Sequence, residues 1–373
     1  MAEQDAVRIF RKLLSSAGIA INGDNPWDLV INHPDTFKRI LRQGVLGLGE
    51  SYMDGWWDCQ ALDQFFDRVL RARIDRVIRG NLWLAWDVWK AMLVNHQKTS
   101  RAYEVGVRHY DIGNDLYRAM LDSRMVYTCG YWKDARNLDE AQEAKLDLVC
   151  RKVGLKPGMK VLDLGCGWGS FARYAAERYG AEVVGVTVSK EQVELGNSLC
   201  SGLPVDIRLQ DYRSVKGKFD RVVSIGIMEH VGYKNYRTYM EVVDHTLKDD
   251  GIGFFHTIGG NVSVKIGNPW TTKYIFPNGQ IPSIAQLGKA MEGLFVMEDW
   301  HNIGPDYDRT LMAWHESFEQ SWPGLKDRYS ERFRRMWRFY LLSSAGAFRS
   351  RSVQLWQVVM TKPGLRQPAC RLS

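Results

Sequence analysis

Short apolar runs alternate with amphipathic segments through the middle of this 373-residue chain. Runs of strand length lie at Val161–Leu164, Glu182–Val188, Val205–Leu209, Phe219–Ile225 and Gly251–Ile258. Segments with helical spacing of apolar residues stand between most of them, at Phe171–Tyr179, Lys190–Cys200 and Lys234–Leu247. Strands that alternate with helices pair in parallel through right-handed crossovers. The pattern therefore predicts an α/β fold with a doubly wound sheet.

The pattern extends on both sides of this region. A helix is expected at Leu138–Val153, closing strands at Phe295–Trp300 and Val353–Met360, and helices at Thr310–Trp322 and Glu331–Phe348. The first hundred residues contain helical spacing only, at Gln4–Ser16, Asp35–Gln43 and Leu62–Ile78. Because His96–Arg101 is polar, we expect a smaller N-terminal helical domain over 1–95, a linker over 96–108 and an α/β domain over 109–373.

Two aromatic stretches in the N-terminal region invite a functional interpretation. Gly44–Cys59 combines glycines with aromatic residues that look exposed, but it suggests no chemistry. In Asn81–Val94, Trp83, Trp86 and Trp89 stand three residues apart. Tryptophan suits a membrane interface because its ring is apolar and its N–H is polar. Ordinary core packing explains the same spacing, so both interpretations stay open.

Composition is that of a folded globular protein, with 45% hydrophobic and 25% charged residues. The N-terminus lacks an apolar signal core and no run approaches 18 apolar residues, which predicts a cytosolic chain that does not span a membrane. The cysteines show neither Cys-x-x-Cys spacing nor a nearby histidine pair, which predicts free thiols in a reducing compartment and no metal site. They are Cys59, Cys129, Cys150, Cys166, Cys200 and Cys370.

The formal net charge of +7 is unevenly distributed. One basic stretch contains Arg68, Arg71, Arg73, Arg76 and Arg79, and another runs from Lys326 to Arg351. Such faces suit the phosphates of nucleic acid or of anionic lipids. A solvated helix face accounts for either stretch equally well.

A glycine-rich segment follows the first predicted strand of the α/β domain. It reads Asp163-Leu-Gly-Cys-Gly-Trp-Gly169, so that glycines occupy 165, 167 and 169. Ligands of open parallel sheets bind at the carboxyl ends of the strands, where such a turn lets them approach the backbone. The spacing differs from the dinucleotide fingerprint and from the phosphate loop. It resembles motif I of the S-adenosylmethionine-dependent methyltransferases.

Further motifs narrow the resemblance. The segments Tyr127-Thr-Cys-Gly-Tyr-Trp132, Gly226-Ile-Met-Glu-His-Val-Gly232 and His256-Thr-Ile-Gly259 resemble those of the cyclopropane-fatty-acid synthases and their mycolic-acid relatives. Other matching segments are Tyr274–Gly279, Asp299–Asn302, Asp306–Asp308 and Gln354–Val359. The match through Leu48–Trp57 favours the bacterial phospholipid-acting branch. In contrast to many methyltransferases, the second strand ends without a ribose-binding acid.

The resemblance implies a Rossmann-like class I methyltransferase fold and an activity. S-adenosylmethionine would donate a methylene group across a cis double bond of an unsaturated phospholipid, giving a cyclopropane fatty acid. The family holds a bicarbonate ion, whose ligands carry over to Cys129, Glu229, His256, Ile258 and Tyr307. Contacts to S-adenosylmethionine carry over to Tyr127, Thr128, Gly165, Cys166, Gly167, Gly169, Thr187, Gln192, Asp211 and Tyr212, with Asp163 orienting the loop. The resemblance also implies a cytoplasmic homodimer, associated peripherally with the anionic inner face of the membrane.

Part of this site follows from topology alone. Glu229, His256 and Ile258 each follow or end a predicted parallel strand, so they should converge at one sheet edge beside the glycine loop. A single histidine at a strand end is more often structural, and only the combination favours a site. The chemistry needs aromatic faces for a carbocation, and a desolvated cation–π contact is worth about 2 kcal/mol. The 12% aromatic content can supply such faces.

One departure from the family and three alternatives remain. Some members carry an influential cysteine where this chain has Ser344, which cannot supply a thiolate. A methyltransferase acting on RNA, protein or a small metabolite is one alternative, but no RNA-binding module is recognisable, so no nucleic-acid partner is expected. A lipid methyltransferase with a methyl-branched product is the second. A non-catalytic protein that binds anionic membranes is the third.

Overall fold

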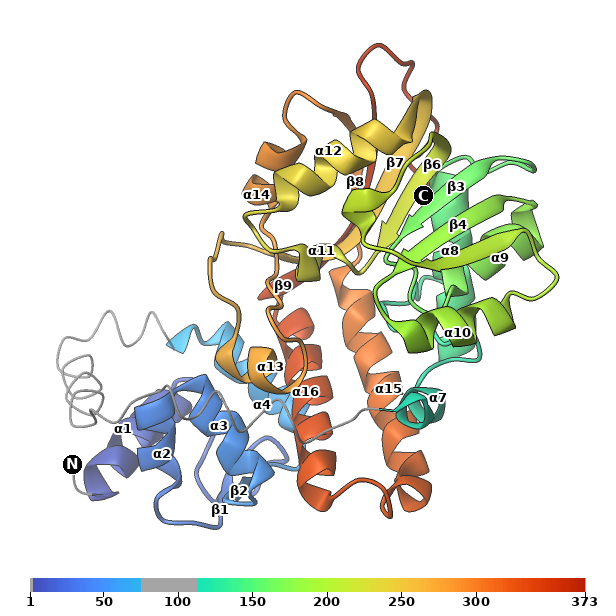
Figure 1. Cartoon of the computed structure of the whole chain (residues 1–373). Helices are drawn as coiled ribbons and strands as arrows, with labels where there is room; N and C mark the ends of the chain where they lie inside the picture. The colour runs from blue at the N-terminus through green and yellow to red at the C-terminus, as the bar shows by residue number, and fades with distance from the viewer. Residues whose placement is uncertain (1–2, 75–112, 373) are drawn as a thin grey trace. The chain divides into compact units, whose positions relative to one another are not determined.

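The computed structural model describes residues 3–74 and 113–372. These fall into two compact units, each built from several stretches of the chain (Figure 1). Unit 1 contains Met1–Met120, Gly267–Asn278 and Leu311–Ser352. Unit 2 contains Leu121–Ile266, Gly279–Thr310 and Val353–Ser373, and it holds the glycine loop.

Unit 2 is built on a seven-stranded sheet of order β5-β4-β3-β6-β7-β9-β8. Its strands are β3 Lys160–Leu164, β4 Glu182–Thr187, β5 Val205–Leu209, β6 Phe219–Ile225, β7 Leu247–Gly260, β8 Val296–Asn302 and β9 Val353–Thr361. The strands from β5 to β7 in this order pair in parallel, and β9 pairs antiparallel with both β7 and β8. The chain reverses its direction of winding at β3, which confirms the predicted doubly wound sheet with its switch point beside the glycine loop.

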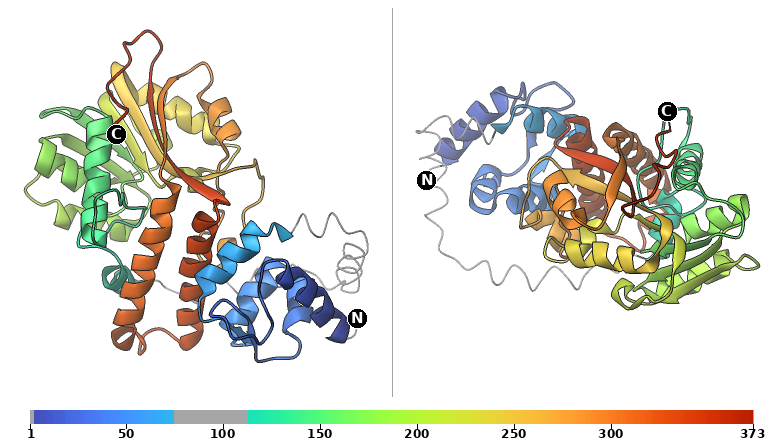
Figure 2. Two further views of the ribbon diagram at one scale, coloured as in Figure 1. Left: turned by 180° about the vertical axis from the view of Figure 1, so that it is seen from behind. Right: turned by 90° about the horizontal axis from the view of Figure 1, so that it is seen from above.

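Alternate residues of the central strands enter two separate cores. Val161 of β3 and Phe254 of β7 pack with α8 Leu138–Lys152 and α9 Ser170–Tyr179. Their neighbours Leu162 and Phe255 pack with α12 Tyr236–Thr246 and α14 Ile284–Met291. Figure 1 shows α12 on one face, and the reversed view in Figure 2 shows α8 on the other. Burial of both faces explains the continuous apolar strand runs of the sequence.

Each of the remaining elements of unit 2 follows a strand of the sheet. They are α10 Lys190–Leu199, the 3₁₀ turn η2 Tyr212–Ser214, α11 Met228–Val231 and the first turns of α15 Gly304–Leu325. The sequence placed the ends of α10 and of the strands within four residues of the observed ends, and those of β5 and β6 without error. It began α15 at Thr310, six residues late, because the first turns of this helix lack a regular apolar spacing.

Unit 1 is helical, as expected for the N-terminal region, but it also receives two later segments. Its elements are α1 Glu3–Ser15, α2 Thr36–Gln43, α3 Val45–Met53, α4 Leu62–Arg71, α7 Asn114–Met120, α13 Pro269–Tyr274, α16 Glu331–Arg349 and most of α15. A small sheet joins β1 Val30–Ile31 to β2 Trp57–Asp58. The predicted helix at Leu62–Ile78 is wrong in its length, because α4 ends at Arg71 and Arg73 has a φ of +47°.

The glycine-rich stretch at 44–59 corrects the impression of exposed aromatics. Its first part is the helix α3, and Tyr52 and Trp57 are each only 1% exposed. The Trp57 indole N–H donates to Ser51 Oγ over 3.0 Å. A Cβ on Gly49 would lie 2.3 Å from the Trp270 ring, so this glycine permits close packing of α3 against α13. The stretch is therefore a structural core of unit 1.

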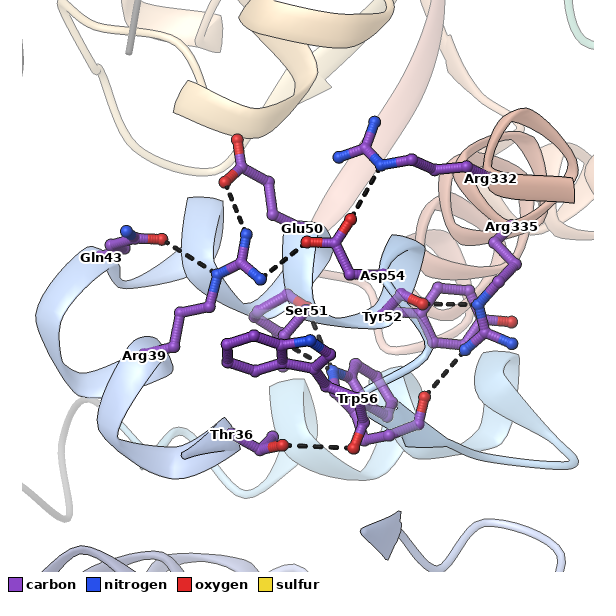
Figure 3. A network of polar contacts seen from close by, with 12 residues as sticks. Thr36, Arg39, Gln43, Glu50, Ser51, Tyr52, Asp54, Trp56, Arg332 and Arg335 are labelled. Carbon is purple, nitrogen blue, oxygen red and sulfur yellow. Dashed lines mark hydrogen bonds and ion pairs between the residues drawn. The ribbon is translucent and has the colours of Figure 1, made fainter. Parts of the chain in front are cut away.

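A polar network ties α2, α3 and α16 together within unit 1 (Figure 3). Arg39 binds Glu50 Oε2 over 3.1 Å and Asp54 Oδ2 over 2.7 Å. Arg332 binds the other oxygen of Asp54 over 2.8 Å, and Arg335 donates to the carbonyl of Tyr52 over 2.5 Å. The basic stretch 326–351 thus supplies ion pairs inside the protein, and the hypothesis that its arginines form a phosphate-binding face finds no support at these positions.

Several predictions concern residues outside the described ranges. These are the tryptophan segment 81–94, the linker 96–108, and Arg76 with Arg79. The boundary between an N-terminal and an α/β domain therefore stays a prediction. All six cysteines are described, and they are free thiols buried in the protein, as predicted. Among the described helices, none combines the length and the apolar character that crossing a membrane requires.

Candidate active site

The glycine loop leaves β3 at the switch point of the sheet. Gly165, Gly167 and Gly169 have φ values of +78°, +56° and +78°, a backbone region that residues with a Cβ rarely adopt. The N–H groups of Gly165 and Cys166 both donate to the carbonyl of Val186 over 3.0 Å, which fixes the loop to the end of β4. A Cβ on Gly167 would meet no atom within 4 Å. The loop is thus held in place and open to a ligand at its middle glycine.

Three loops converge at the carboxyl ends of β3, β6 and β7. A Cβ on Gly165 would lie 2.8 Å from the Ile227 side chain, so the glycine loop contacts the turn after β6. A Cβ on Gly226 in that turn would lie 2.7 Å from Thr128. The Gly226 N–H donates to the His256 carbonyl over 2.8 Å. This arrangement confirms the convergence that the parallel topology predicted.

Glu229 lies on the short helix α11 and points at the end of β7. Its Oε1 accepts the Ile258 N–H over 2.5 Å. Its Oε2 is shielded from solvent and has no hydrogen-bond partner among the described residues. Burial raises the pKa of this carboxyl to about 7 and outweighs the Ile258 N–H and the nearby Thr257 side chain, which lower the pKa. Glu229 can therefore exchange a proton near neutral pH.

His256 on β7 is 1% exposed. Burial lowers its pKa well below the usual value, and the positive charges of Lys145 and Lys152 lower it further. The imidazole is consequently neutral at physiological pH. Its Nδ1 lies 3.5 Å from Gln357 Nε2 on the neighbouring strand β9, and its Nε2 has no hydrogen-bond partner among the described residues.

Cys129 and Tyr307 belong to two segments that are bonded together. The loop containing Cys129 is held by α15, since Thr310 Oγ1 accepts the Gly130 N–H over 3.0 Å and Asp306 Oδ2 accepts the Trp132 N–H over 3.0 Å. Tyr307 lies between these two α15 residues and is 8% exposed. Burial raises the pKa of the Cys129 thiol well above its usual value, so the sulfur is not a thiolate. Any role for Cys129 then falls to its neutral thiol or its backbone.

Sequence reasoning missed a buried cation beside these residues. Lys145 on α8 is 0% exposed, and its Nζ donates to Thr128 Oγ1 over 2.9 Å. Burial lowers its pKa to about 8, against the raising effects of Asp122, Cys129 and Asp163. Burial raises the pKa of Asp163 to about 7, although the positive charge of Lys145 lowers it. Its position on the apolar face of a helix is the sequence signal that could have identified Lys145.

Thr310 is the second residue that the sequence did not single out. It is 0% exposed, and besides the Gly130 N–H its hydroxyl accepts the Trp132 indole N–H over 2.8 Å. The hydroxyl donates to the Asp306 carbonyl over 2.8 Å. One hydroxyl therefore fixes the loop that carries Tyr127, Thr128 and Cys129. A threonine inside a helix carries no such signal in the sequence.

The residues expected near the ribose and adenine lie after β4 and β5. Thr187 Oγ1 donates to Gln192 Oε1 over 2.6 Å, which joins the end of β4 to α10. Asp211 accepts the Arg213 N–H over 2.9 Å and pairs with its guanidinium, and these bonds hold the pKa of Asp211 at about 2. The Tyr212 ring lies 5.5 Å from that of Tyr239. These predicted side chains lie at or after the carboxyl ends of β4 and β5, at the same edge of the sheet as the glycine loop. Their contacts with a cofactor stay predictions.

The buried polar groups around Glu229 and His256 fit a small anion that can both donate and accept hydrogen bonds. Glu229 Oε2 and His256 Nε2 are buried atoms without a partner among the described residues, and such atoms are costly to leave unpaired. Bicarbonate carries one O–H group and acceptor oxygens, so it would pair with a carboxylate and with a neutral imidazole N–H. The Ile258 N–H already donates to Glu229 Oε1. A bond from Ile258 to the anion would therefore require this N–H to donate to both acceptors.

Comparison with known proteins identifies the family of this chain. The family model for mycolic acid cyclopropane synthetase matches residues 97–358. The chain is 55% identical over 355 residues to cyclopropane-fatty-acyl-phospholipid synthase of Escherichia coli strain K12, covering 95% of this chain and 93% of the relative. The chain belongs to the cyclopropane synthase family. Members of this family are S-adenosylmethionine-dependent methyltransferases, and the class I methyltransferase fold predicted from the sequence is confirmed.

Two further comparisons agree. Tuberculostearic acid methyltransferase UfaA1 of Mycobacterium tuberculosis is 32% identical, with 98% of this chain and 90% of the relative covered. The structure of mycolic acid cyclopropane synthase CmaA1 complexed with SAH and CTAB superposes with a TM-score of 0.62 at 30% identity, covering 72% of this chain and 100% of that one. The relatives thus include enzymes named for ring formation and one named for methylation.

All fifteen residues predicted to bind the cofactor or the anion lie in unit 2 of this cyclopropane synthase family member. Thr128, Gly165, Glu229, His256 and Ile258 are joined by the contacts described above. Ser344 lies on α16 in unit 1, half-buried, and a serine there still supplies no thiolate.

Proposed function

We propose that the chain transfers a methylene group, derived from the methyl of S-adenosylmethionine, across a cis double bond of an unsaturated phospholipid acyl chain. The product would be a cyclopropane fatty acid. The observation that carries this proposal is a pair of buried atoms, Glu229 Oε2 and His256 Nε2, that have no hydrogen-bond partner within residues 3–74 and 113–372 and lie beside the glycine loop. Membership of the cyclopropane synthase family supports the same substrate class.

The chemistry requires a methyl donor and then a proton acceptor. The alkene π electrons would form a bond to the methyl carbon while the carbon–sulfur bond breaks, releasing S-adenosylhomocysteine and leaving a carbocation on the acyl chain. Loss of a proton from the new methyl would let its C–H electrons close the ring. Bicarbonate held by Cys129, Glu229, His256, Ile258 and Tyr307 would supply the immediate proton acceptor.

The residues of this chain would prepare that site. Glu229 titrates near neutral pH, so its carboxylate can take up the proton that ring closure releases. Neutral His256 can donate one hydrogen bond without adding a charge that would repel the carbocation. The buried position of both groups keeps water from the cation, because water would otherwise trap it as an alcohol.

Location and assembly belong to the same proposal. A phospholipid substrate places the enzyme at a membrane surface, and we propose peripheral association with the anionic cytoplasmic face. We further propose a homodimer, which sedimentation of the purified protein would test. A lone monomer at working concentration would reject this part and leave the catalytic proposal intact.

Mass spectrometry of the acyl chains tests the reaction. Purified protein would be incubated with S-adenosylmethionine and vesicles of monounsaturated phosphatidylglycerol, with and without bicarbonate. A gain of one CH₂ with loss of the ozone-cleavable alkene would support ring formation, and bicarbonate dependence would support the anion site. A methyl-branched or still unsaturated product would reject ring closure, and unmodified chains despite cofactor binding would reject the substrate.

A further inference from the structure

Apolar side chains are exposed together on the segment that follows β7. Residues 261–266 are six consecutive exposed positions. Val262 is 73% exposed, Val264 43% and Ile266 83%. Ile284, at the start of α14, is 54% exposed. Single exposed apolar residues are common, but a cluster on one loop marks a contact surface.

The loop is anchored in this outward-facing conformation. The Ser263 and Ser283 hydroxyls lie 2.6 Å apart, and the Gly260 N–H donates to the Pro282 carbonyl over 2.8 Å. The Val264 carbonyl accepts the side-chain amide of Gln280 over 2.7 Å. Because Ser283 precedes Ile284, the first of these bonds also brings the exposed isoleucine of α14 beside the loop. The Gly260 N–H and the Val264 carbonyl are thus bonded to the protein, while the apolar side chains of the loop are exposed to solvent.

The charge around this loop favours an anionic partner. Residues 261–266 contain Lys265 and no acidic residue, and α14 contains Lys289 and no acidic residue. Lys265 lies within the loop and Lys289 on α14, and both are exposed. Near an anionic bilayer each such cation contributes about 1 kcal/mol. Two copies of the loop facing each other would instead bring lysines of like charge together, which disfavours a second copy of the chain as the occupant.

The loop is also connected to the active site. It continues directly from β7, which carries His256 and Ile258. Gln280, which holds Val264, donates its backbone N–H to the Glu229 carbonyl over 2.7 Å. Its side-chain oxygen accepts the Tyr233 N–H over 2.8 Å. One buried residue therefore anchors both the exposed loop and the helix that carries Glu229.

We propose that Val262, Val264 and Ile266 insert into the interfacial region of an anionic phospholipid bilayer, with Lys265 and Lys289 contacting the headgroups. This inference rests on the proposed function, because a substrate chain that starts in a bilayer must pass from it to the site at the end of β7. It names the element that makes the contact, which family membership does not give.

A triple substitution with a matched control tests the contact. Val262→Ser/Val264→Ser/Ile266→Ser would be compared with Val296→Ser/Met297→Ser/Leu365→Ser, which removes apolar residues that are 44%, 48% and 37% exposed elsewhere. Binding to phosphatidylglycerol vesicles would be measured by co-sedimentation. We expect the loop variant to bind about tenfold more weakly or worse and the control to change by less than about twofold. Equal effects in both variants would overturn the inference.

A fluorescent probe reports insertion without relying on loss of binding. Because the six native cysteines are buried, Val264→Cys can be labelled selectively with an environment-sensitive dye. Its emission should shift to the blue on adding phosphatidylglycerol vesicles, but not phosphatidylcholine vesicles. An unchanged spectrum in vesicle-bound protein would place the membrane contact elsewhere, and a shift that follows protein concentration alone would indicate a second copy of the chain.

The outcome can be separated from that of the proposed function. The loop variant should retain S-adenosylmethionine affinity and turnover of detergent-dispersed unsaturated phospholipid. If the unaltered protein forms no product from either presentation of the lipid, the proposed function fails. If it forms product and binds vesicles while the loop variant behaves identically, only this inference fails.

Discussion

The Ile258 backbone N–H donates to Glu229 Oε1 over 2.5 Å, and this bond connects the last residues of β7 to the helix after β6. It orients one oxygen of the carboxylate and leaves Oε2 in a buried position. The two oxygens therefore have different environments. A carboxylate held in this way can accept a proton on one oxygen without losing its position.

Replacing Glu229 with glutamine tests this arrangement. The amide keeps the shape but cannot take a proton, so we expect turnover to fall by about a hundredfold or more while S-adenosylmethionine affinity changes little. Product formation and isothermal titration measure the two properties. Glu182→Gln, at an exposed position, serves as the control. Equal loss of cofactor binding and turnover would contradict the assigned role.

The same substitution should alter the pH dependence of stability. The pKa of Glu229 is raised from 4.5 to about 7 in the folded protein, so its stabilising contribution is complete below pH 4.5 and is lost as the pH rises through 7. Above that pH the buried carboxylate costs on the order of 3 kcal/mol. We therefore expect Glu229→Gln to gain stability relative to the unaltered protein between pH 5 and about pH 8, as measured by urea unfolding.

Turnover itself should rise with pH. The base must be unprotonated, and the pKa of Glu229 is about 7, so turnover at saturating substrates should increase through neutral pH and then level off. Glu229→Gln should lack this limb in its residual activity. A flat profile from about pH 6 to pH 8 in the unaltered enzyme would show that another group limits the reaction.

Lys145→Met should weaken the cofactor site. The substitution removes the hydrogen bond to Thr128 Oγ1 and the positive charge near Asp163. Because Thr128 is a predicted cofactor contact, we expect the Kd for S-adenosylmethionine to rise about tenfold. This is the size of effect that losing one hydrogen bond from a charged group, here Lys145, produces. Lys152→Met is the control, since this buried lysine pairs instead with Asp299 over 2.8 Å. The control should lose stability without a comparable change in cofactor affinity.

Thr310→Val should destabilise the loop around Cys129. Two buried donors, the Gly130 N–H and the Trp132 indole N–H, would lose their shared acceptor, at a cost of about 2–4 kcal/mol. Thr246→Val is a matched control, because its buried hydroxyl donates to carbonyls of its own helix. Thermal unfolding should separate the two variants. Equal shifts would mean that the Thr310 hydroxyl does not organise the loop.

Glu50→Gln tests the network of unit 1. Glu50 accepts from Lys273 over 2.7 Å, from Tyr274 over 2.9 Å and from Arg39 over 3.1 Å. Loss of its charge removes the ion pair of Lys273 and leaves Arg39 paired with Asp54 alone, so we expect a loss of about 2–4 kcal/mol. Burial raises the pKa of Glu50, but these bonds outweigh it and lower the pKa, so the loss should fade as the pH falls below 4.5. Asp35→Asn, which breaks an exposed pair, should cost under about 1 kcal/mol.

The sequence by itself determined the sheet and much of the site. Apolar runs placed the strands because both faces of a parallel sheet are buried, and the glycine spacing placed the ligand loop at the end of β3. The convergence of Glu229, His256 and Ile258 followed from parallel topology, since the carboxyl ends of parallel strands share one edge. The antiparallel β9 and the extent of α15 did not follow, because local periodicity records neither partner nor direction.

Only the tertiary structure decided what each polar group does. The Ile258 N–H proved to serve Glu229, Lys145 proved to be buried beside Thr128, and the basic stretch around Arg332 and Arg335 proved to form bonds within unit 1. Charge and hydrogen-bonding capacity are written in the sequence. Burial and partners are not, because they depend on residues up to hundreds of positions away, and these set both the pKa of Glu229 and the exposure of Val262 and Ile266.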